Sequence, residues 1–354
     1  MARIKVLAAD DSTVARRFLA EAIGSDPELE LVALAGNGRV ALDRLENADP
    51  DVVVLDVEMP ELDGLATLAE MKRRRPRLPV IMFSTHTERG AATTLDALAI
   101  GASDYLHKPT ALGLGKSNDD EVRAALVAKI KLLSYKPLQG RAPGSVRVAK
   151  PFEPTRIECV AIGVSTGGPN ALAEVFKALV EPLPVPVYIV QHMPAVFTRR
   201  LAERLDSLGS MRVCEAEEGM LALPGRAYVA PGDFHLTVDG DMHRPLLHLD
   251  QNEQENSCRP AADVLFRSVA RVYGARCLGV VLTGMGQDGL RGAELMRQGG
   301  ASVIAQDEAT SVVWGMPGSV VRARVASEVL PIEGVAGAIA QRATFGRSRG
   351  SYPS

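Results

Sequence analysis

The sequence lacks the features that mark secreted, metal-binding, membrane and nucleic-acid-binding proteins. Its four cysteines form neither a C-x-x-C pair nor a metal-ligand spacing, so we expect buried thiols in a reducing compartment. No apolar run is long enough to cross a membrane, and Asp10 and Asp11 interrupt the first one, which argues against a signal peptide. A net charge of −3 gives no basic footprint for nucleic acid. We therefore expect a cytoplasmic protein with no membrane insertion and no nucleic-acid partner.

What the sequence does contain is the composition and length of a two-domain globular protein. It has 354 residues, of which 46% are hydrophobic and 23% charged. Apolar runs alternate with helical patterns in its first part, which predicts a parallel sheet covered on both faces. The expected strands lie at residues 4–9, 31–35, 52–55, 80–83 and 103–106, and a last helix lies near residues 119–133.

The composition changes at residues 134–156, where four prolines and an excess of basic residues predict an extended linker. A second α/β alternation follows, with strands expected near residues 158–163, 187–190, 227–230, 278–282 and 302–305. We therefore predict two doubly wound α/β domains, at residues 1–133 and 157–345. The polar tail at residues 346–354 is expected to be disordered.

Three carboxylates converge in the first predicted sheet. Asp10 and Asp11 end its first strand and Asp56 ends its third, and these strands are neighbours in a 2-1-3-4-5 order. Their mutual repulsion requires a counter-charge, and a hard divalent cation such as Mg²⁺ suits oxygen ligands. Ser84 and Lys108 end the fourth and fifth strands. A carboxylate beside Mg²⁺, a hydroxyl and a lysine forms a site for a phosphoryl group, which Asp56 would attack.

A serine marks the start of the second domain. Gly163-Val-Ser-Thr-Gly-Gly-Pro169 follows an apolar run and precedes a helical pattern, so Ser165 is expected on a tight strand-to-helix turn. Its hydroxyl would project from the sheet edge beside backbone N–H groups at a helix N-terminus. The G-x-S-x-G match is short and also fits a phosphate-binding turn, so a nucleophile here needs partner residues.

Two partners lie after later strands. His192 follows the second strand of this domain as a candidate general base, and Asp288 lies in a glycine-rich loop after residues 278–282. His192 would take the Ser165 proton, and Asp288 would fix the histidine tautomer and stabilise the imidazolium. Backbone N–H groups near Thr166 and Met285 are expected to bind the oxyanion.

Other polar residues are weaker candidates. His235, His243 and His248 lie in or beside a strand-and-turn pattern without suitable metal-ligand spacing, and Asp233 is in a Pro-Gly-Asp sequence typical of a turn. His86 and His107 are interpreted as surface residues.

The first domain resembles the receiver domain of two-component response regulators over about residues 3–130. The resemblance is carried by Asp10-Asp11, Leu55-Asp56-Val-Glu-Met-Pro60, Asp63-Gly64, Ser84 and Lys108-Pro109. It implies that Asp56 accepts a phosphoryl group, that Asp10, Asp11 and Asp56 hold Mg²⁺, and that Ser84 and Lys108 contact the phosphoryl group. It also implies that Tyr105 changes rotamer with the state of Ser84.

The second domain resembles the catalytic domain of the chemotaxis protein-glutamate methylesterases, a Rossmann-like fold. The matching segments are residues 163–169, 191–193, 228–235, 282–289 and 314–318. The chain order Ser165, His192, Asp288 differs from that of the α/β-hydrolases, so the resemblance does not extend to that family. One departure is Glu253-Gln-Glu-Asn-Ser-Cys258, where the family usually carries a histidine-containing, Pro/Asn-rich stretch. This departure puts substrate contacts from the segment in doubt.

The two resemblances together imply a phosphorylation-regulated hydrolase that removes methyl groups from glutamate methyl esters on chemoreceptor helices and deamidates receptor glutamines. A chemotaxis histidine kinase would donate the phosphoryl group, the esterase would need no cofactor, and the chain is expected to be a monomer. In the unphosphorylated state the receiver would cover the Ser165 edge. The alternatives are a transcriptional regulator, disfavoured by the lack of a basic helix-turn-helix, and a non-catalytic adaptor, disfavoured by the intact Ser165, His192 and Asp288.

Overall fold

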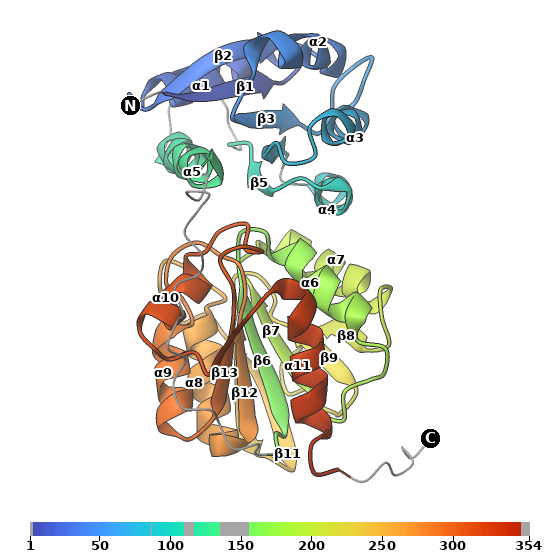
Figure 1. The fold of residues 1–354 in the computed structure, drawn as a ribbon, viewed down its shortest axis with the longest axis vertical. Helices are drawn as coiled ribbons and strands as arrows, with labels where there is room; N and C mark the ends of the chain where they lie inside the picture. Colours follow the sequence, from blue (N-terminus) through green and yellow to red (C-terminus); the bar gives the residue numbers. More distant parts are fainter. Residues whose placement is uncertain (1–2, 86, 110–116, 135–155, 348–354) are drawn as a thin grey trace. The chain divides into compact units, whose positions relative to one another are not determined.

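The computed structural model describes residues 3–85, 87–109, 117–134 and 156–347 (Figure 1). The chain divides into two compact units, Met1–Ala142 and Pro143–Ser354. Most of the predicted linker (residues 135–155) and of the predicted tail (residues 348–354) lies outside the described residues.

The first unit is a parallel sheet with the order β2-β1-β3-β4-β5. Its strands are β1 (Ile4–Ala9), β2 (Leu29–Ala35), β3 (Val52–Asp56), β4 (Val80–Ser84) and β5 (Asp104–His107). Its helices are α1 (Thr13–Gly24), α2 (Gly38–Ala48), α3 (Gly64–Arg74), α4 (Glu88–Ile100) and α5 (Ser117–Ser134). Helix α1 packs against α5, and α3 packs against both α2 and α4, so the sheet lies between two helical layers.

The second unit has a seven-stranded parallel sheet with the order β14-β13-β12-β6-β7-β9-β8 and a separate antiparallel hairpin, β10-β11. Its strands are β6 (Cys159–Val164), β7 (Val187–Gln191), β8 (Arg212–Glu215), β9 (Arg226–Val229), β10 (His235–Asp241), β11 (Arg244–Asp250), β12 (Cys277–Val281), β13 (Ser302–Gln306) and β14 (Glu328–Leu330). Its helices are α6 (Gly168–Ala178), α7 (Ala195–Asp206), α8 (Ala262–Tyr273), the short 3₁₀ helix Gly274–Arg276, α9 (Leu290–Gln298), α10 (Met316–Arg322) and α11 (Ile332–Thr344).

The helices of the second unit cover both faces of its sheet. Helices α6, α7 and α11 lie on one face, and α8, α9 and α10 lie on the other (Figure 1). Because both faces are covered, every residue of β6, β7, β12 and β13 is buried, which explains their continuous apolar runs. Helix α8 buries Leu265, Phe266 and Val269 at helical spacing against this sheet, and the β10-β11 hairpin packs on the same helix.

The predicted fold class is confirmed: both units are doubly wound parallel sheets, and the order 2-1-3-4-5 of the first is as expected. The ten predicted strands are all present, with ends shifted by at most a few residues. The prediction missed β8 and β14, the two edge strands of the large sheet. Both are short and only partly buried, with charged residues along them, as is common where a sheet ends, so neither shows a strong apolar signal.

Helices α8 and α9 approach so closely that only glycine fits at one position between them. A Cβ added at Gly292 would lie 2.5 Å from the Phe266 Cβ and 3.0 Å from the Asp263 carbonyl oxygen. We therefore expect Gly292→Ala to push the helices apart and lower the free energy of unfolding by about 1–3 kcal/mol. Trp314, the single tryptophan of the chain, lies in this unit, so its fluorescence during urea unfolding measures the change.

Gly337→Ala in α11 is the matched control. No atom lies within 4 Å of a Cβ added there, and Gly337 is exposed. Alanine should then stabilise the unit by about 0.5–1 kcal/mol, because glycine loses more backbone entropy on folding. Equal destabilisation by both substitutions would contradict the close-packing argument.

Candidate functional site

Ser165 directly follows the buried strand β6, on the turn that leads into α6. Its backbone N–H donates to the Thr283 carbonyl oxygen over 3.0 Å, and its own carbonyl oxygen accepts from the Gly168 N–H over 2.8 Å. Gly167 has a φ of +79°, a left-handed conformation that glycine adopts without strain. The tight turn expected from the sequence is therefore present, with Ser165 at the carboxyl end of the strand.

Gln191 links the ends of β6 and β7. Its Nε2 donates to the carbonyl oxygens of Ser165, over 3.0 Å, and His192, over 3.3 Å. A Cβ added at Gly168 would lie 1.9 Å from Gln191 Oε1, so only glycine at position 168 leaves room for the Gln191 side chain. This role of Gln191 was not predicted from the sequence. A buried glutamine at the end of an otherwise apolar strand was the available signal.

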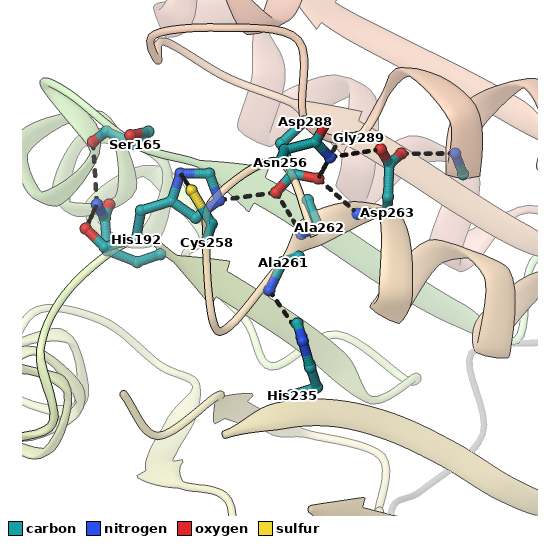
Figure 2. A network of polar contacts seen from close by, with 12 residues as sticks. Ser165, His192, His235, Asn256, Cys258, Ala261, Ala262, Asp263, Asp288 and Gly289 are labelled. Carbon is teal, nitrogen blue, oxygen red and sulfur yellow. Dashed lines mark hydrogen bonds and ion pairs between the residues drawn. The ribbon is translucent and has the colours of Figure 1, made fainter. Parts of the chain in front are cut away.

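His192 follows β7 and pairs with Asp288 from the loop after β12. The His192 Nε2 lies 2.7 Å from Asp288 Oδ2, and both side chains are largely buried. Strands β12, β6 and β7 are consecutive in the sheet, so the ends of three neighbouring strands supply Asp288, Ser165 and His192 (Figure 2). The structure therefore brings the three predicted residues to one sheet edge.

The Asp288 carboxylate accepts several further hydrogen bonds. The N–H groups of Ala262 and Asp263 at the start of α8 donate over 2.6 and 3.0 Å, and that of Gly289 donates over 2.9 Å. Burial favours the neutral acid, but the contact with His192 and these donors outweigh it and lower the pKa of Asp288. Asp288 is thus held as a carboxylate.

The same pair raises the pKa of His192. Burial favours the neutral imidazole, but hydrogen bonds with Asp288 and Cys258 outweigh burial and raise the pKa of His192 to about 9. Because Nε2 faces the carboxylate, it carries the proton, and Nδ1 is the basic nitrogen. Among the residues that the structure describes, Nδ1 contacts Cys258 Sγ at 3.6 Å, and the Ser165 hydroxyl has no hydrogen-bond partner.

Thr166 follows Ser165 in the chain, and Met285 belongs to the loop after β12. Thr166 is buried, and its carbonyl oxygen accepts from the Thr283 hydroxyl over 2.9 Å. A Cβ added at Gly284 would lie 2.8 Å from the Ser165 Cβ, so the loop that carries Met285 passes directly against the serine. The Met285 side chain is 47% exposed, and within the described ranges its backbone N–H donates no hydrogen bond.

The remaining histidines of this unit have structural contacts. His235 is buried, with Nε2 3.0 Å from the Glu253 carbonyl oxygen and Nδ1 accepting from the Ala261 N–H over 3.2 Å. The exposed His248 pairs with Glu218 at 2.8 Å. No group of three potential metal ligands includes His235, His243 or His248 in the part of the chain that the structure describes.

The acidic residues of the first unit meet around Lys108. The Lys108 Nζ lies 2.8 Å from both Asp10 Oδ2 and Asp56 Oδ1, and ligand oxygens of Asp10, Asp11 and Asp56 lie within 4.8 Å of one another. Burial and the Asp10 charge together outweigh Lys108 and raise the pKa of Asp56 to about 6. Burial also raises the pKa of Asp10, despite its contact with Lys108.

Ser84 completes this cluster. Its hydroxyl is buried and has no hydrogen-bond partner among the described residues, although it ends the strand beside that of Asp56. A cavity of about 210 Å³ adjoins it, lined by Asp11, Asp56, Val57, Glu58, Ser84, Thr85, Gly90 and Lys108. The cavity, the spare hydroxyl and three hard oxygen donors fit a divalent cation and a phosphoryl group.

Tyr105 lies on β5, partly buried, with its ring edge-on to that of His107 at 5.4 Å between centroids. The prediction that His107 is a surface residue is wrong, since both of its ring nitrogens are buried. Strand β5 has only four residues, too few for an alternation of polar and apolar residues to show that this histidine ring is buried. His86 lies outside the described residues.

None of the helices in the described ranges is long and apolar enough to cross a membrane.

Both halves of the chain match known protein families. Residues 160–339 match the family described as CheB methylesterase, and residues 6–114 match the response regulator receiver domain. A protein-glutamate methylesterase/protein-glutamine glutaminase of Trichodesmium erythraeum is 42% identical over 350 residues, which cover 97% of this chain and 99% of the relative. A protein of the same name from Pyrococcus horikoshii is 42% identical over 339 residues, covering 94% of this chain and 91% of that protein.

A solved structure agrees with these sequence matches. The crystal structure of the Thermotoga maritima CheB methylesterase catalytic domain superposes with a TM-score of 0.51 at 41% identity, covering 53% of this chain and 99% of that chain. The second unit thus matches a methylesterase domain, which favours a hydrolase over the alternative of a transcriptional regulator. Since the full-length relatives match both halves in the same order, the chain belongs to the CheB methylesterase family and carries a receiver domain ahead of its methylesterase domain.

Proposed function

We propose that this chain hydrolyses glutamate methyl esters on chemoreceptors, and deamidates receptor glutamines, with Ser165 as the nucleophile. The observation that carries the proposal is the His192–Asp288 pair, joined at 2.7 Å, at the strand end beside Ser165. Ser165 has an unengaged hydroxyl at the same sheet edge, and the chain's relatives bear the name of this activity.

Acylation begins with proton transfer from Ser165. Because Asp288 holds Nε2 of His192, Nδ1 takes the serine proton as Oγ attacks the ester carbonyl carbon. The hydroxyl must approach Nδ1 from the side where Cys258 Sγ now lies, and such contacts commonly tighten only when substrate is bound. Collapse of the tetrahedral intermediate breaks the bond to the methoxy oxygen, and methanol leaves with the proton from His192.

Deacylation repeats the same proton transfers with water. His192 takes a proton from water, the hydroxide attacks the acyl-enzyme, and Ser165 leaves with the proton returned by His192. A glutamine side chain follows the same course, with ammonia as the leaving group. Backbone N–H groups near Thr166 and Met285 would bind the oxyanion, and one such donor typically contributes about 3–4 kcal/mol. The Met285 N–H has no hydrogen-bond acceptor among the described residues, which supports this role.

The receiver is proposed to accept a phosphoryl group on Asp56 from a histidine kinase. An Asp56 oxygen forms the new bond to phosphorus as the bond to the kinase histidine nitrogen breaks. With a pKa of about 6, Asp56 is mostly ionised at neutral pH and thus nucleophilic. Asp10, Asp11 and Asp56 would hold Mg²⁺, which supplies positive charge to the phosphoryl oxygens when bound. Lys108 and Ser84 contact the same oxygens, and Tyr105 responds to Ser84.

Phosphorylation is proposed to control access to Ser165. We expect the protein to act in the cytoplasm. There the unphosphorylated receiver would cover the sheet edge that carries Ser165, and the phosphorylated receiver would expose that edge to substrate. The presence of a phosphoryl site and a hydrolase site in one chain supports this coupling.

Ser165→Ala tests the nucleophile. Methanol release from methylated receptor membranes should fall by several orders of magnitude, since the substitution removes the oxygen that is proposed to form the acyl-enzyme. Ser207→Ala, at the end of α7, is the control and should retain full activity. Equal methanol release by wild type and Ser165→Ala would overturn the assignment of Ser165 as the nucleophile, and release by neither above the rate without enzyme would favour the adaptor alternative.

The pH dependence tests the base. Only the unprotonated Nδ1 of His192 accepts a proton, so kcat/KM should rise with pH up to about 9, the pKa of His192. Asp288→Asn removes a contact that raises this pKa, so the acidic limb should move to lower pH while kcat falls. A comparable exposed pair, His248 with Glu218, supplies the control Glu218→Gln, which should leave the profile unchanged. A wild-type profile already level near the ordinary imidazole pKa of 6.5 would refute the assignment.

Asp56→Asn tests the switch. Acetyl phosphate with Mg²⁺ should stimulate methanol release by the wild type and have no effect on the variant, because a neutral amide is not a nucleophile for phosphorus. Asp43→Asn, an exposed aspartate on α2, should respond as the wild type does. Removal of residues 1–140 should also raise the basal rate, and the absence of any gain would contradict the covering of Ser165.

A further inference from the structure

The turn Glu255–Cys258 contacts both members of the His192–Asp288 pair. The Glu255 and Cys258 backbones exchange hydrogen bonds, with N–H to oxygen distances of 3.2 and 2.9 Å. The two central residues, Asn256 and Ser257, have φ values of 54° and 59°, as in a tight two-residue hairpin turn. Asparagine tolerates this left-handed conformation well. Asn256 is exposed as a residue, but its amide reaches two buried carboxylates.

The Asn256 amide bridges two buried carboxylates. Its Nδ2 lies 2.9 Å from Asp288 Oδ1 and 2.9 Å from Asp263 Oδ2 (Figure 2). Asp263 is fully buried and Asp288 is 2% exposed. Both partners accept hydrogen bonds, so the NH₂ end of the amide must face them, and each of its two protons serves one carboxylate.

This bridge fixes the orientation of Asp288. Asn256 Nδ2 and the N–H groups of Asp263 and Gly289 donate to Oδ1, which leaves Oδ2 toward His192 and the Ala262 N–H. Asp263 is anchored in turn, because its Oδ1 accepts from the Gly292 N–H over 2.7 Å. The amide therefore ties the catalytic carboxylate to a second, rigidly held carboxylate.

We propose that Asn256 is a positioning residue for the hydrolase, which holds Asp288 in the rotamer that orients His192 and offsets the repulsion between Asp288 and Asp263. The proposal rests on the proposed function of Ser165, His192 and Asp288. It assigns the unusual segment at residues 253–258 a role in catalysis in addition to any contact with substrate.

The charges around the bridge determine what its loss does. Burial raises the pKa of Asp263, and the charges of Asp288 and Glu255 raise it further. The hydrogen bonds from Gly292 and Asn256 oppose this rise. The charged and titratable groups that face this region are His192, Glu255, Cys258, Asp263, Arg267, Asp288 and, through Glu255, His235. Without the amide protons the site is more negative, so the imidazolium form of His192 is favoured.

Asn256→Gly is the decisive variant, because glycine keeps the left-handed turn and removes the amide. We expect kcat for methanol release to fall about 10-fold to 100-fold, as for residues that orient catalytic groups from behind, with little change in KM. The acidic limb of the pH profile should move to higher pH. Ser257→Gly is the matched control, since Ser257 is exposed at the neighbouring left-handed position, and its rate and profile should be unchanged.

Adding Asp263→Asn separates positioning from general loosening of the turn. Removal of one negative charge should move the limb of the Asn256→Gly enzyme back to lower pH, an effect that loose packing would not produce. The ring ¹⁵N signals of His192, assigned with His192→Gln, report the same pKa without turnover. Asn256→Asp keeps the shape and the turn but replaces the donor with an acceptor, so it should lose at least as much activity.

The outcomes discriminate between this proposal and the one it rests on. If Asn256→Gly and Asn256→Asp keep the wild-type kcat and pH profile while Ser165→Ala is inactive, Asn256 does not position the pair. If Ser165→Ala retains activity, the proposed function itself fails. If kcat falls but the acidic limb is unmoved in Asn256→Gly and in its combination with Asp263→Asn, the residue is structural only and the proposal is overturned.

Discussion

The sheet edge that carries Ser165, His192 and Asp288 depends on keeping one buried carboxylate ionised. Asp288 is 2% exposed, and burial by itself favours its neutral form. Five donors offset that cost: His192 Nε2, Asn256 Nδ2 and the N–H groups of Ala262, Asp263 and Gly289. The backbone donors come from the N-termini of α8 and α9, whose dipoles also favour a negative charge. Much of the local architecture, including the close contact of these helices, is therefore tied to one side chain.

The receiver site also contains buried carboxylates, but fewer hydrogen-bond donors offset their charge. One ammonium, that of Lys108, serves both Asp10 and Asp56 at 2.8 Å, so the site holds more negative charge than it compensates. The result is opposite in sign: burial and mutual repulsion raise the pKa of Asp56 to about 6, whereas that of Asp288 is lowered. The Asp288 carboxylate, whose oxygens all accept hydrogen bonds, is suited to orienting His192. The Asp56 carboxylate, whose negative charge is only partly balanced, remains available to a cation and a phosphoryl group.

The sequence predicted the parts of the fold and site that short-range patterns encode. Continuous apolar runs identified the buried strands, and polar residues just after them identified Ser165, His192 and Asp288. It did not reveal Gln191 or Asn256, because their roles arise from contacts between segments 26 and 32 residues apart. It missed β8 and β14 because edge strands need little apolar surface, and it misplaced His107 because half-buried strands show weak alternation.

The segment at residues 253–258, where the sequence analysis expected a departure from the family pattern, reaches both members of the His192–Asp288 pair. Asn256 touches Asp288, and Cys258 Sγ touches His192 Nδ1. Arg267 of α8 pairs with Glu255 at 2.6 Å, so the same helix that caps Asp288 also anchors the turn. A substitution of Asn256 or Cys258 therefore changes a direct contact of this pair. In this chain the turn both supplies a donor to Asp288 and places a thiol against Nδ1 of His192.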